Sequence, residues 1–488
     1  MTELCRLSLN HASTATALIA GDEHWTYGSL NDAVRSLAAA MGRDGLAGER
    51  VAMMLPNGSD AVVTYLACFA SGAVAAPLNS RYAAPEAEHA LRRARPRWLV
   101  VHPSRLGTLD AVDPAALDGV RVLVSGAAAT RTGYGPLGPL LGGPGEDPPS
   151  AAGGAPAVIF FTSGSTGVPK GVVHSHDSAL AILTSTSEAL GNVRADDVVQ
   201  VFEPLVHVSG FIAALTTLLA GGTVALHDGF DATAYVAALR THQPTLICTH
   251  IDLVAQVLRV AGVDSATFAS LRGVYTGGDS VPAALQREFK ELTGLPIGVG
   301  WGMTEAIWLT IAREPPIDRD GCIGVPVGGA EIRADAHTDE LLVRGPMVMQ
   351  QYWGDPELTA ATLHDGWLRT GDLGRVDASG VWWFTGRIKD IIVRRTSKIT
   401  SGEVESALEQ HPNVAIAAVV AAPDPDEGQV PVAFVVPKAG ASLTSIELVD
   451  YLRTRIAAYK IPARIHLRDA LPLTASGKIS RHDLHEDI

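Results

Sequence analysis

Cysteine is scarce in this chain: Cys5, Cys68, Cys248 and Cys322 are spread over 488 residues. No two of them have the close spacing of a zinc-ligand pair or of a redox dithiol, so the sequence favours neither kind of site. Scattered thiols are typical of a reducing compartment, where they pack as small buried hydrophobic side chains. We therefore expect a cytoplasmic protein.

Positive charge is also in short supply. The chain has 38 Lys and Arg residues against 52 Asp and Glu residues, which gives a net charge of −14. This balance argues against nucleic acid or an anionic membrane as the main partner. An anionic small-molecule substrate would have to be drawn by positive charge placed locally.

Long hydrophobic runs are missing as well. The longest apolar stretch, residues 61–78, contains Gly72 and ends near Pro77, which suits a buried helix, a turn and a strand better than a membrane span. The first residues include an acid, Glu3, and lack a basic region followed by an apolar run, so we expect no secretion signal. No internal repeat is visible.

The chain does contain a glycine- and hydroxyl-rich loop after an apolar strand, in residues 160–171 with the sequence FFTSGSTGVPKG. Hydroxyl groups, inward-turned backbone N–H groups and a lysine together suit polyphosphate. A P-loop needs Gly before the lysine and Ser or Thr after it, whereas Pro169 and Gly171 flank Lys170. The expected ATP-binding residues here are Thr162, Ser163, Gly164, Ser165, Thr166, Gly167 and Lys170.

Short β-rich runs alternate with helical patterns over most of the chain, which predicts parallel sheets with crossover helices. The expected strands are 51–54, 98–101, 122–124, 158–161, 223–226, 245–247 and 274–275, and the expected helices include 30–41, 179–190 and 281–293. Residues 142–150 have the composition of a linker. Beyond Arg387 an α+β pattern begins, with strands at 416–420 and 432–436 and capping boxes at Thr400/Glu403 and Thr444/Glu447.

Further motifs follow the loop in a fixed order: PLVHVSG at 204–210, YTGGD at 275–279, WGMTE at 301–305, GWLRTGDLG at 366–374, GRIKD at 386–390 and PLTASGKISR at 472–481. This ordered set covers almost the whole chain. It resembles the adenylate-forming enzymes, the superfamily of acyl-CoA synthetases, peptide-synthetase adenylation domains and firefly luciferases. The resemblance implies an α/β fold, in which a large N-terminal domain (1–388) has two α/β-layered sheets plus a distorted β-barrel. A small mobile α+β C-terminal domain (389–488) follows.

The resemblance also implies roles for single residues. Lys478 is the expected catalytic lysine, Thr304 contacts the α-phosphate, Glu305 holds Mg²⁺, and Lys389 is the hinge. Nucleotide contacts are expected from Gly277, Gly278, Asp279, Trp301 and Gly302 along the adenine, and from Asp372 and Arg387 at the ribose. The acid pocket is expected at His207, Ser209, His250 and Gly300. Taken singly, Trp301 can also be read as a core residue, Lys478 as a surface lysine and His250 as a helix-start residue.

The implied chemistry is ATP-dependent activation of a carboxylic acid. The acid attacks the α-phosphorus of ATP, pyrophosphate leaves, and the acyl group of the acyl-AMP passes to an acceptor, for which CoA is our first choice. Positioning and fixed positive charge suffice for such a step. ATP and Mg²⁺ are the expected cofactors, CoA is a possible co-substrate, and a monomer or homodimer is expected.

Two departures from the family pattern leave alternatives open. Thr396 stands where CoA ligases have a glycine beside the pantetheine tunnel, although Arg394, Arg395, Lys398 and residues 459–462 resemble their basic surface. Ser401 replaces a proline at the expected first helical position. Residues 248–252, CTHID, favour a small or polar acid. The alternatives are a nitrite-activating diazotase of secondary metabolism with an arylamine acceptor, an amide or carrier-protein ligase, and a non-catalytic ATP-binding relative.

Overall fold

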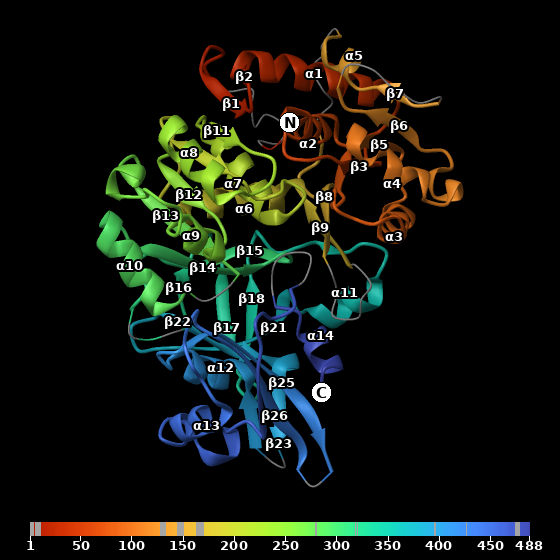
Figure 1. Cartoon of the computed structure of the whole chain (residues 1–488). Helices are drawn as coiled ribbons and strands as arrows, with labels where there is room; N and C mark the ends of the chain where they lie inside the picture. Colours follow the sequence, from red (N-terminus) through yellow and green to blue (C-terminus); the bar gives the residue numbers. More distant parts are fainter. Residues whose placement is uncertain are drawn as a thin grey trace. The chain divides into compact units, whose positions relative to one another are not determined.

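The computed structural model describes Leu4 and residues 11–126, 133–143, 151–162, 170–278, 281–317, 319, 321–394, 397–425, 427–473 and 479–488. The chain divides into two compact units, whose elements are labelled in Figure 1. Unit 1 comprises residues 1–319, 323–332 and 343–368, and unit 2 comprises residues 320–322, 333–342 and 369–488. Unit 2 contains the whole predicted C-terminal domain and some strands before it. A functional boundary at 388/389 stays a prediction.

The first sheet of unit 1 has eight strands, and its central strands are parallel and almost wholly buried. Continuous apolar runs such as Trp98–Val101 belong in such a sheet because both of its faces are covered. The strand order is β19 (Gln351–Tyr352), β9 (Lys170–Ser175), β8 (Pro156–Thr162), β4 (Val74–Pro77), β3 (Arg50–Met54), β5 (Trp98–Val101), β6 (Arg121–Val124) and β7 (Gly135–Pro136).

The second sheet of unit 1 contains most of the strands of this unit that are not in the first sheet. In neighbour order they are β16 (Cys322–Pro326), β15 (Ala306–Ala312), β14 (Ile297–Met303), β13 (Gly273–Gly277), β12 (Leu246–Cys248), β10 (Val198–Val201), β11 (Thr223–Leu226), β1 (Thr16–Ala20) and β2 (Glu23–Thr26). The strands from β14 to β1 are mutually parallel, so their carboxyl ends lie along one edge.

Helices cover both faces of this second sheet. Helices α8 (Ala232–His242), α9 (Ile251–Val257) and α10 (Ala283–Thr293) share a buried apolar cluster with β12, β13 and β14 on one face. On the other face α6 (His176–Ala189) packs against β15, and α7 (Val208–Leu219) packs against α6, β10 and β11. The remaining helices of unit 1 are α1 (Tyr27–Arg43), α2 (Ser59–Ser71), α3 (Ala84–Ala94), α4 (Leu106–Asp110), α5 (Gly138–Leu141) and α11 (Pro356–Thr362).

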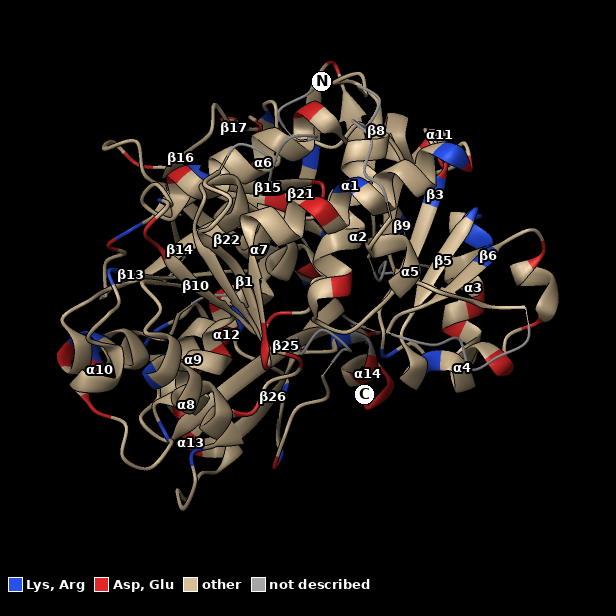
Figure 2. Ribbon diagram, turned by 90° about the horizontal axis from the view of Figure 1, so that it is seen from above, with Lys and Arg blue, Asp and Glu red and all other residues tan. Residues whose placement is uncertain are grey.

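The strand and helix predictions from the sequence are confirmed within a few residues at each end. The apolar stretch 61–78 forms α2, a turn at Gly72 with φ +74°, and β4, as expected. Charged residues colour the outer helices α3, α4 and α10 in Figure 2, whereas most strand segments are free of charge. Most of the predicted linker, residues 144–150, lies outside the described residues.

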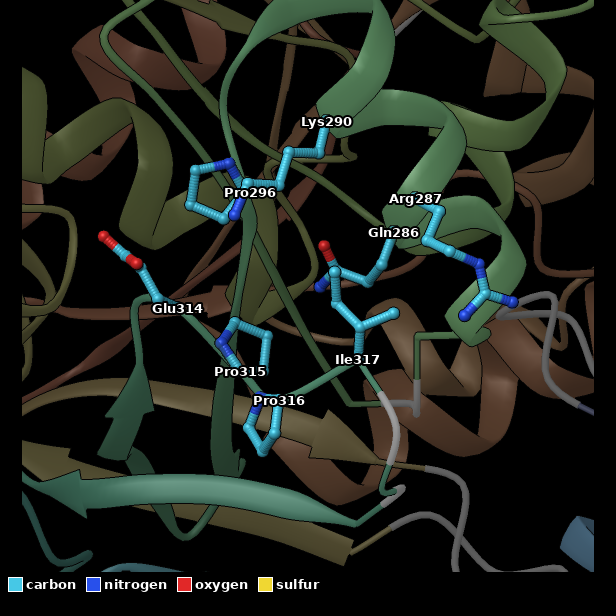
Figure 3. Close-up of a pocket in the computed structure, with 8 residues that line it drawn as sticks. All are labelled: Gln286, Arg287, Lys290, Pro296, Glu314, Pro315, Pro316 and Ile317. Carbon is cyan, nitrogen blue, oxygen red and sulfur yellow. The ribbon is translucent and has the colours of Figure 1, made fainter.

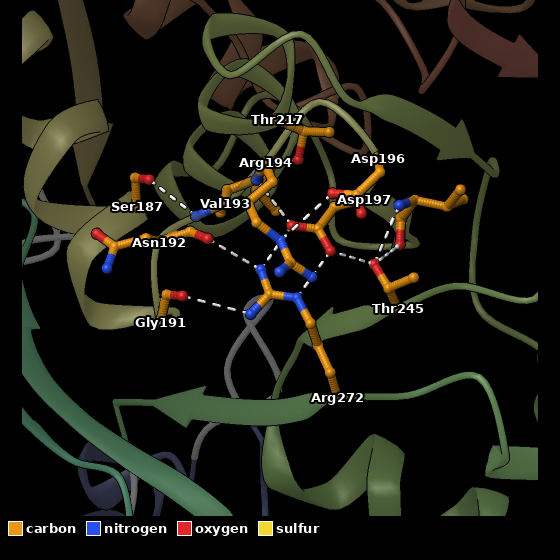
Figure 4. A network of polar contacts seen from close by, with 12 residues as sticks. Ser187, Gly191, Asn192, Val193, Arg194, Asp196, Asp197, Thr217, Thr245 and Arg272 are labelled. Atoms are coloured by element: carbon orange, nitrogen blue, oxygen red, sulfur yellow. Dashed lines mark hydrogen bonds and ion pairs between the residues drawn. The ribbon is translucent and has the colours of Figure 1, made fainter.

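A polar network joins the amino ends of three parallel strands (Figure 4). Asp197, Thr245 and Arg272 each stand immediately before a strand: β10, β12 and β13. Arg272 donates to Asp197 from Nε at 2.8 Å, and the Thr245 hydroxyl donates to the same carboxylate at 2.6 Å. Burial raises the pKa of Asp197, but the bonds from Arg272 and Thr245 outweigh it and hold the pKa below its ordinary value. A buried ion pair therefore holds the amino ends of these three strands together.

Unit 2 contains a separate five-stranded sheet and all or part of four further strands. These four are neighbours in the order β17 (Glu331–Ala334), β18 (Glu340–Arg344), β21 (Trp367–Val376) and β22 (Trp382–Arg387), and β20 (Leu363–His364), which belongs to unit 1, pairs with β21. The five-stranded sheet has β24 (Ser397–Thr400), β23 (Ile391–Arg394), β26 (Gly428–Pro437) and β25 (Val414–Asp424), with β27 (Arg464–Leu467) beside β26. Helices α12 (Ser401–Glu409), α13 (Ser445–Arg453) and α14 (Arg481–Glu486) complete the unit.

The two predicted capping boxes have different outcomes. The one at Thr444 and Glu447 is confirmed at the start of α13. The one at Thr400 and Glu403 is wrong: Thr400 is the N-cap residue of α12, but its side chain makes no capping bond, and Glu403 pairs with Lys460 instead. Ser401 is the first helical residue, as predicted, and its hydroxyl donates to the carbonyl of Asp390 at 2.7 Å.

Candidate active site

The carboxyl ends of β10, β12, β13 and β14 bring together most of the predicted site residues of unit 1. His207 follows β10, His250 follows β12, Gly278 follows β13, and Thr304 and Glu305 follow β14. In an open α/β sheet, ligands bind outside the carboxyl ends of the strands. Gly278 has φ +85°, a conformation that favours glycine, where the chain turns away from β13.

Lys170 and Glu305 are brought into one cluster by Tyr352, a residue that the sequence analysis missed. The hydroxyl of Tyr352 donates to Oε1 of Glu305 at 2.6 Å, and Nζ of Lys170 lies 5.5 Å from the centre of the tyrosine ring. Burial and the charge of Glu305 raise the pKa of Tyr352, so the hydroxyl keeps its proton. Lys170 pairs with Thr162 across β9 and β8, and Ser163, Gly164, Ser165, Thr166 and Gly167 lie outside the described residues.

The backbone of Thr304 is held by His174, a second residue that the sequence analysis did not predict. Nε2 of His174 lies 2.8 Å from the Thr304 carbonyl oxygen, which can only accept, so this nitrogen carries the proton. Burial lowers the pKa of His174 to about 4, so the imidazole is neutral near pH 7. Trp301 is buried, and position 302 admits only glycine because a Cβ there would lie 2.8 Å from the backbone nitrogen of Trp308.

The predicted acid pocket contains a buried carboxylate that the sequence analysis also missed. Oε1 of Glu203 accepts from the Thr249 hydroxyl at 2.8 Å and from the His250 backbone N–H at 3.2 Å, and Oε2 lies 3.5 Å from Nε2 of His250. Asn57 holds the segment by donating to the Glu203 carbonyl at 2.9 Å. An acid inside the apolar run VFEPL was the signal in the sequence.

His207 and His250 lie beside this carboxylate. Burial lowers the pKa of His207, the charges of His250 and Arg81 act in the same direction, and Glu203 opposes them. His250 is the N-cap residue of α9, without a capping bond from its side chain. It therefore stands at a helix start, and its role in the acid pocket stays a prediction. Ser209 lies in the first turn of α7. Gly300 is covered by the indole of Trp308, since a Cβ at position 300 would overlap that ring.

Unit 2 carries the predicted ribose-binding pair. Asp372 on β21 and Arg387 on β22 are direct partners in the antiparallel register, and Nε of Arg387 donates to Oδ1 of Asp372 at 3.0 Å. Lys389 lies in a single 3₁₀ turn, Ile388–Asp390, where β22 ends. Lys478, Asp279, Arg395 and Thr396 lie outside the described residues, so their roles stay predictions.

Comparison with known proteins agrees with these motifs. The model of the AMP-binding enzyme family matches residues 6–353, and the model of the AMP-binding enzyme C-terminal domain matches residues 403–478. The chain belongs to the AMP-binding enzyme family. It is 35% identical to a feruloyl-CoA synthase from an Amycolatopsis species over an alignment of 489 positions, which covers 96% of this chain and 95% of the relative.

Solved structures of this family agree with the fold. MatB from Rhodopseudomonas palustris with bound ATP has a TM-score of 0.91 and 26% identity, over 100% of this chain and 99% of MatB. The anthranilate CoA ligase AuaEII in complex with anthranoyl-AMP has a TM-score of 0.88 and 27% identity, over 99% of this chain and 96% of the ligase. The predicted fold class and the predicted AMP-forming ligase activity are thereby confirmed.

A cavity of about 500 Å³ in this AMP-binding enzyme lies away from the predicted site (Figure 3). Its lining residues are Gln286, Arg287, Lys290, Pro296, Glu314, Pro315, Pro316 and Ile317. Pro296 immediately precedes β14, so the cavity lies at the amino end of that strand and contains none of the predicted site residues. None of the helices in the described part of the chain has the length and apolarity that crossing a bilayer requires.

Proposed function

We propose that this AMP-forming ligase activates a small or polar carboxylic acid and passes the acyl group to CoA. The polar cluster at the carboxyl edge of the second sheet carries the proposal. Glu203 and Thr249 are buried there beside His207 and His250, where a pocket for a fatty acyl chain would need apolar walls. The curated relative is named for an acid with a polar aromatic ring and for CoA, which supports both parts of the proposal.

In the adenylation step, an oxygen of the acid attacks the α-phosphorus of ATP while the bond to pyrophosphate breaks. Negative charge then grows on the α-phosphate and on the leaving group. Thr304 and Lys478 would stabilise the first charge, and Lys170 with the hydroxyl groups of its loop would stabilise the second. Removing one such preorganised donor costs about 3 kcal/mol, or roughly a hundredfold in rate.

Mg²⁺ fits the residues around Glu305. Mg²⁺ is usually bound by one or two carboxylates together with phosphates of the substrate, so a dedicated cage of protein ligands is not needed. The described residues contain no group of three or more His, Cys, Asp or Glu side chains that could hold a metal on their own. When bound, the ion would neutralise phosphate charge, and Tyr352 would keep the Glu305 carboxylate aimed at it.

The nucleotide and the cell compartment complete the proposal. Asp372 and Arg387 would contact the ribose, and Trp301 would stack on the adenine. A cytoplasmic enzyme fits the burial of the thiols of Cys68, Cys248 and Cys322. A monomer or homodimer is part of the same proposal.

The test measures pyrophosphate from the purified enzyme with ATP and Mg²⁺ against a panel of carboxylic acids and against nitrite. CoA is then added, and the products are identified by mass. We expect pyrophosphate with compact or polar acids and a thioester after CoA is added. Pyrophosphate with nitrite and with none of the carboxylates would replace the proposal by the diazotase alternative.

A further inference from the structure

The face of the second sheet of unit 1 on which Gly300 lies has glycines at several positions of β13 and β14, so side chains are missing there. Gly273 and Gly277 on β13 lie on the same side as Gly298 and Gly300 on β14, because Tyr275 pairs with Gly298 and Gly277 pairs with Gly300. Two aromatic rings occupy the freed space. A Cβ at Gly298 would lie 2.6 Å from the ring of Tyr275, and one at Gly300 would overlap the indole of Trp308.

Trp308 reaches this position through an unusual backbone conformation. It lies on β15 with φ +48°, in the left-handed region that a bulky residue rarely adopts. Only 5% of the residue is exposed, so the indole is enclosed by protein. Strain of this kind persists where the surrounding structure holds it and is common at ligand sites. Here it turns the indole over the bare Cα of Gly300.

Gly300, which the indole of Trp308 covers, belongs to the predicted acid pocket. Gly300 pairs with Gly277, the last residue of β13, so it lies at the carboxyl edge of the sheet. Helices α6 and α7 pack on β15 and β10 on this face, and His207 is the N-cap residue of α7. The indole therefore shares a face and an edge of the sheet with the histidine of the acid pocket.

We propose that Trp308 sets the length of the acid that this enzyme accepts. The indole fills the space above Gly300, into which the far end of an extended acid would reach, so compact acids enter and long acids are excluded. The inference rests on the proposed adenylation of a carboxylic acid and adds a size limit to it. Trp308 is a specificity-determining residue in this assignment and takes no part in bond making.

The test compares the wild-type enzyme with Trp308→Gly, Trp308→Ala and the matched control Trp308→Phe. The probes are butyrate, hexanoate and decanoate, with benzoate and cinnamate as rigid acids, and the measurement is kcat/KM for pyrophosphate release. We expect the wild-type value to fall along the straight-chain series. The Gly and Ala variants should raise the ratio of decanoate to butyrate at least about tenfold, because each methylene that fits a pocket is worth about that much. Trp308→Phe should stay close to the wild type.

Folding is checked by thermal unfolding of each variant. Trp308→Gly suits the positive φ, so it keeps the test valid if Trp308→Ala unfolds. A wild-type enzyme that uses decanoate as well as butyrate, or a ratio unchanged in the folded Gly variant, would overturn the size limit alone. A wild-type enzyme that releases pyrophosphate with no carboxylate at all would overturn the proposed function and, with it, this inference.

Discussion

Tyr352 joins two charged residues that are far apart in the sequence. Its hydroxyl donates to Glu305, and its ring lies under the ammonium group of Lys170. Neither contact follows from the motif that contains Lys170 or from the one that contains Glu305. They arise because β19 pairs with β9 and brings Tyr352 beside the first strand residues after the phosphate loop.

Tyr352→Phe should slow adenylation about tenfold or more. A hydrogen bond to a charged group contributes about 1.5–3 kcal/mol, and its loss frees the Glu305 carboxylate to rotate. We expect the Mg²⁺ concentration for half-maximal pyrophosphate exchange to rise in this variant. Tyr27→Phe is the matched control, since the buried hydroxyl of Tyr27 bonds only main-chain carbonyls of Leu218 and Gly222 in the described structure. Equal activity of Tyr352→Phe and wild type would contradict the role given to Tyr352.

At the scale of elements, the two ends of the parallel strands in the second sheet of unit 1 differ: polar contacts join the amino ends, and the predicted ligand residues lie at the carboxyl ends. Asp197, Thr245 and Arg272 lock the amino ends of β10, β12 and β13, whereas the carboxyl ends of the same strands carry the predicted ligand residues. A buried ion pair is weak evidence for net stability, but breaking one partner leaves an uncompensated buried charge. The ion pair of Asp197 and Arg272 should therefore contribute to the stability of the fold and have no effect on the adenylation step.

Asp197→Asn should lower the free energy of unfolding by about 3–5 kcal/mol, measured by urea denaturation, with the kcat of the folded enzyme unchanged. Asp196→Asn is the control, because its ion pair with Arg194 is exposed at 3.3 Å and should contribute about 1 kcal/mol or less. A depressed pKa in the folded state means that the stability from Asp197 is present above the ordinary carboxyl pKa. It is lost as the pH falls, so the gap between wild type and Asp197→Asn should shrink below about pH 4.

Helix α14 begins three residues after the predicted catalytic Lys478. Its first residue, Arg481, donates from one terminal nitrogen to both oxygens of Glu405 at 2.8 and 2.9 Å, and Asp390 lies 3.9 Å from its other terminal nitrogen. Burial raises the pKa of Glu405, and Arg481 offsets part of that effect. Arg481 thus connects the start of α14 to α12 and to Asp390, the residue that follows the predicted hinge.

Arg481→Lys should slow adenylation about tenfold, because a lysine keeps the charge but has a single nitrogen and cannot reach Glu405 and Asp390 from two separate terminal nitrogens. If Arg481 acts by placing Lys478, the same substitution in a Lys478→Ala background should have no further effect on pyrophosphate exchange. Additive losses in the double variant would contradict that link. Arg468→Lys, at an exposed pair with Asp487, serves as the control.

At the scale of the whole molecule, the chain forms two compact units, and the predicted hinge Lys389 lies within unit 2. The boundary between compact units shows where the chain packs in one conformation. A hinge is the position about which a domain rotates between two conformations, so the two need not coincide. The 3₁₀ turn around Lys389 is a short element at the end of β22, which is the kind of segment that absorbs a change in backbone angles.

Lys389→Pro should spare adenylation and block transfer to the acceptor, since proline fixes φ and prevents the backbone rotation. Single-turnover assays would measure acyl-AMP formation and thioester formation separately. Lys389→Ala should retain both steps. An equal loss of both half-reactions in Lys389→Pro would argue against a hinge at this position.

The sequence by itself determined the features that depend on neighbours along the chain. The alternation of strands and helices, the turn at Gly72 and the cap at Thr444 each follow from short-range periodicity, backbone sterics and capping. The order of the motifs was sufficient to indicate the family.

Only the tertiary structure decided which side chains meet. Glu403 pairs with Lys460 in place of the predicted cap, Glu203 lies beside His250, and Trp308 covers Gly300. These contacts depend on which strands and helices become neighbours and on which face each residue occupies. Local patterns along the chain do not contain that information.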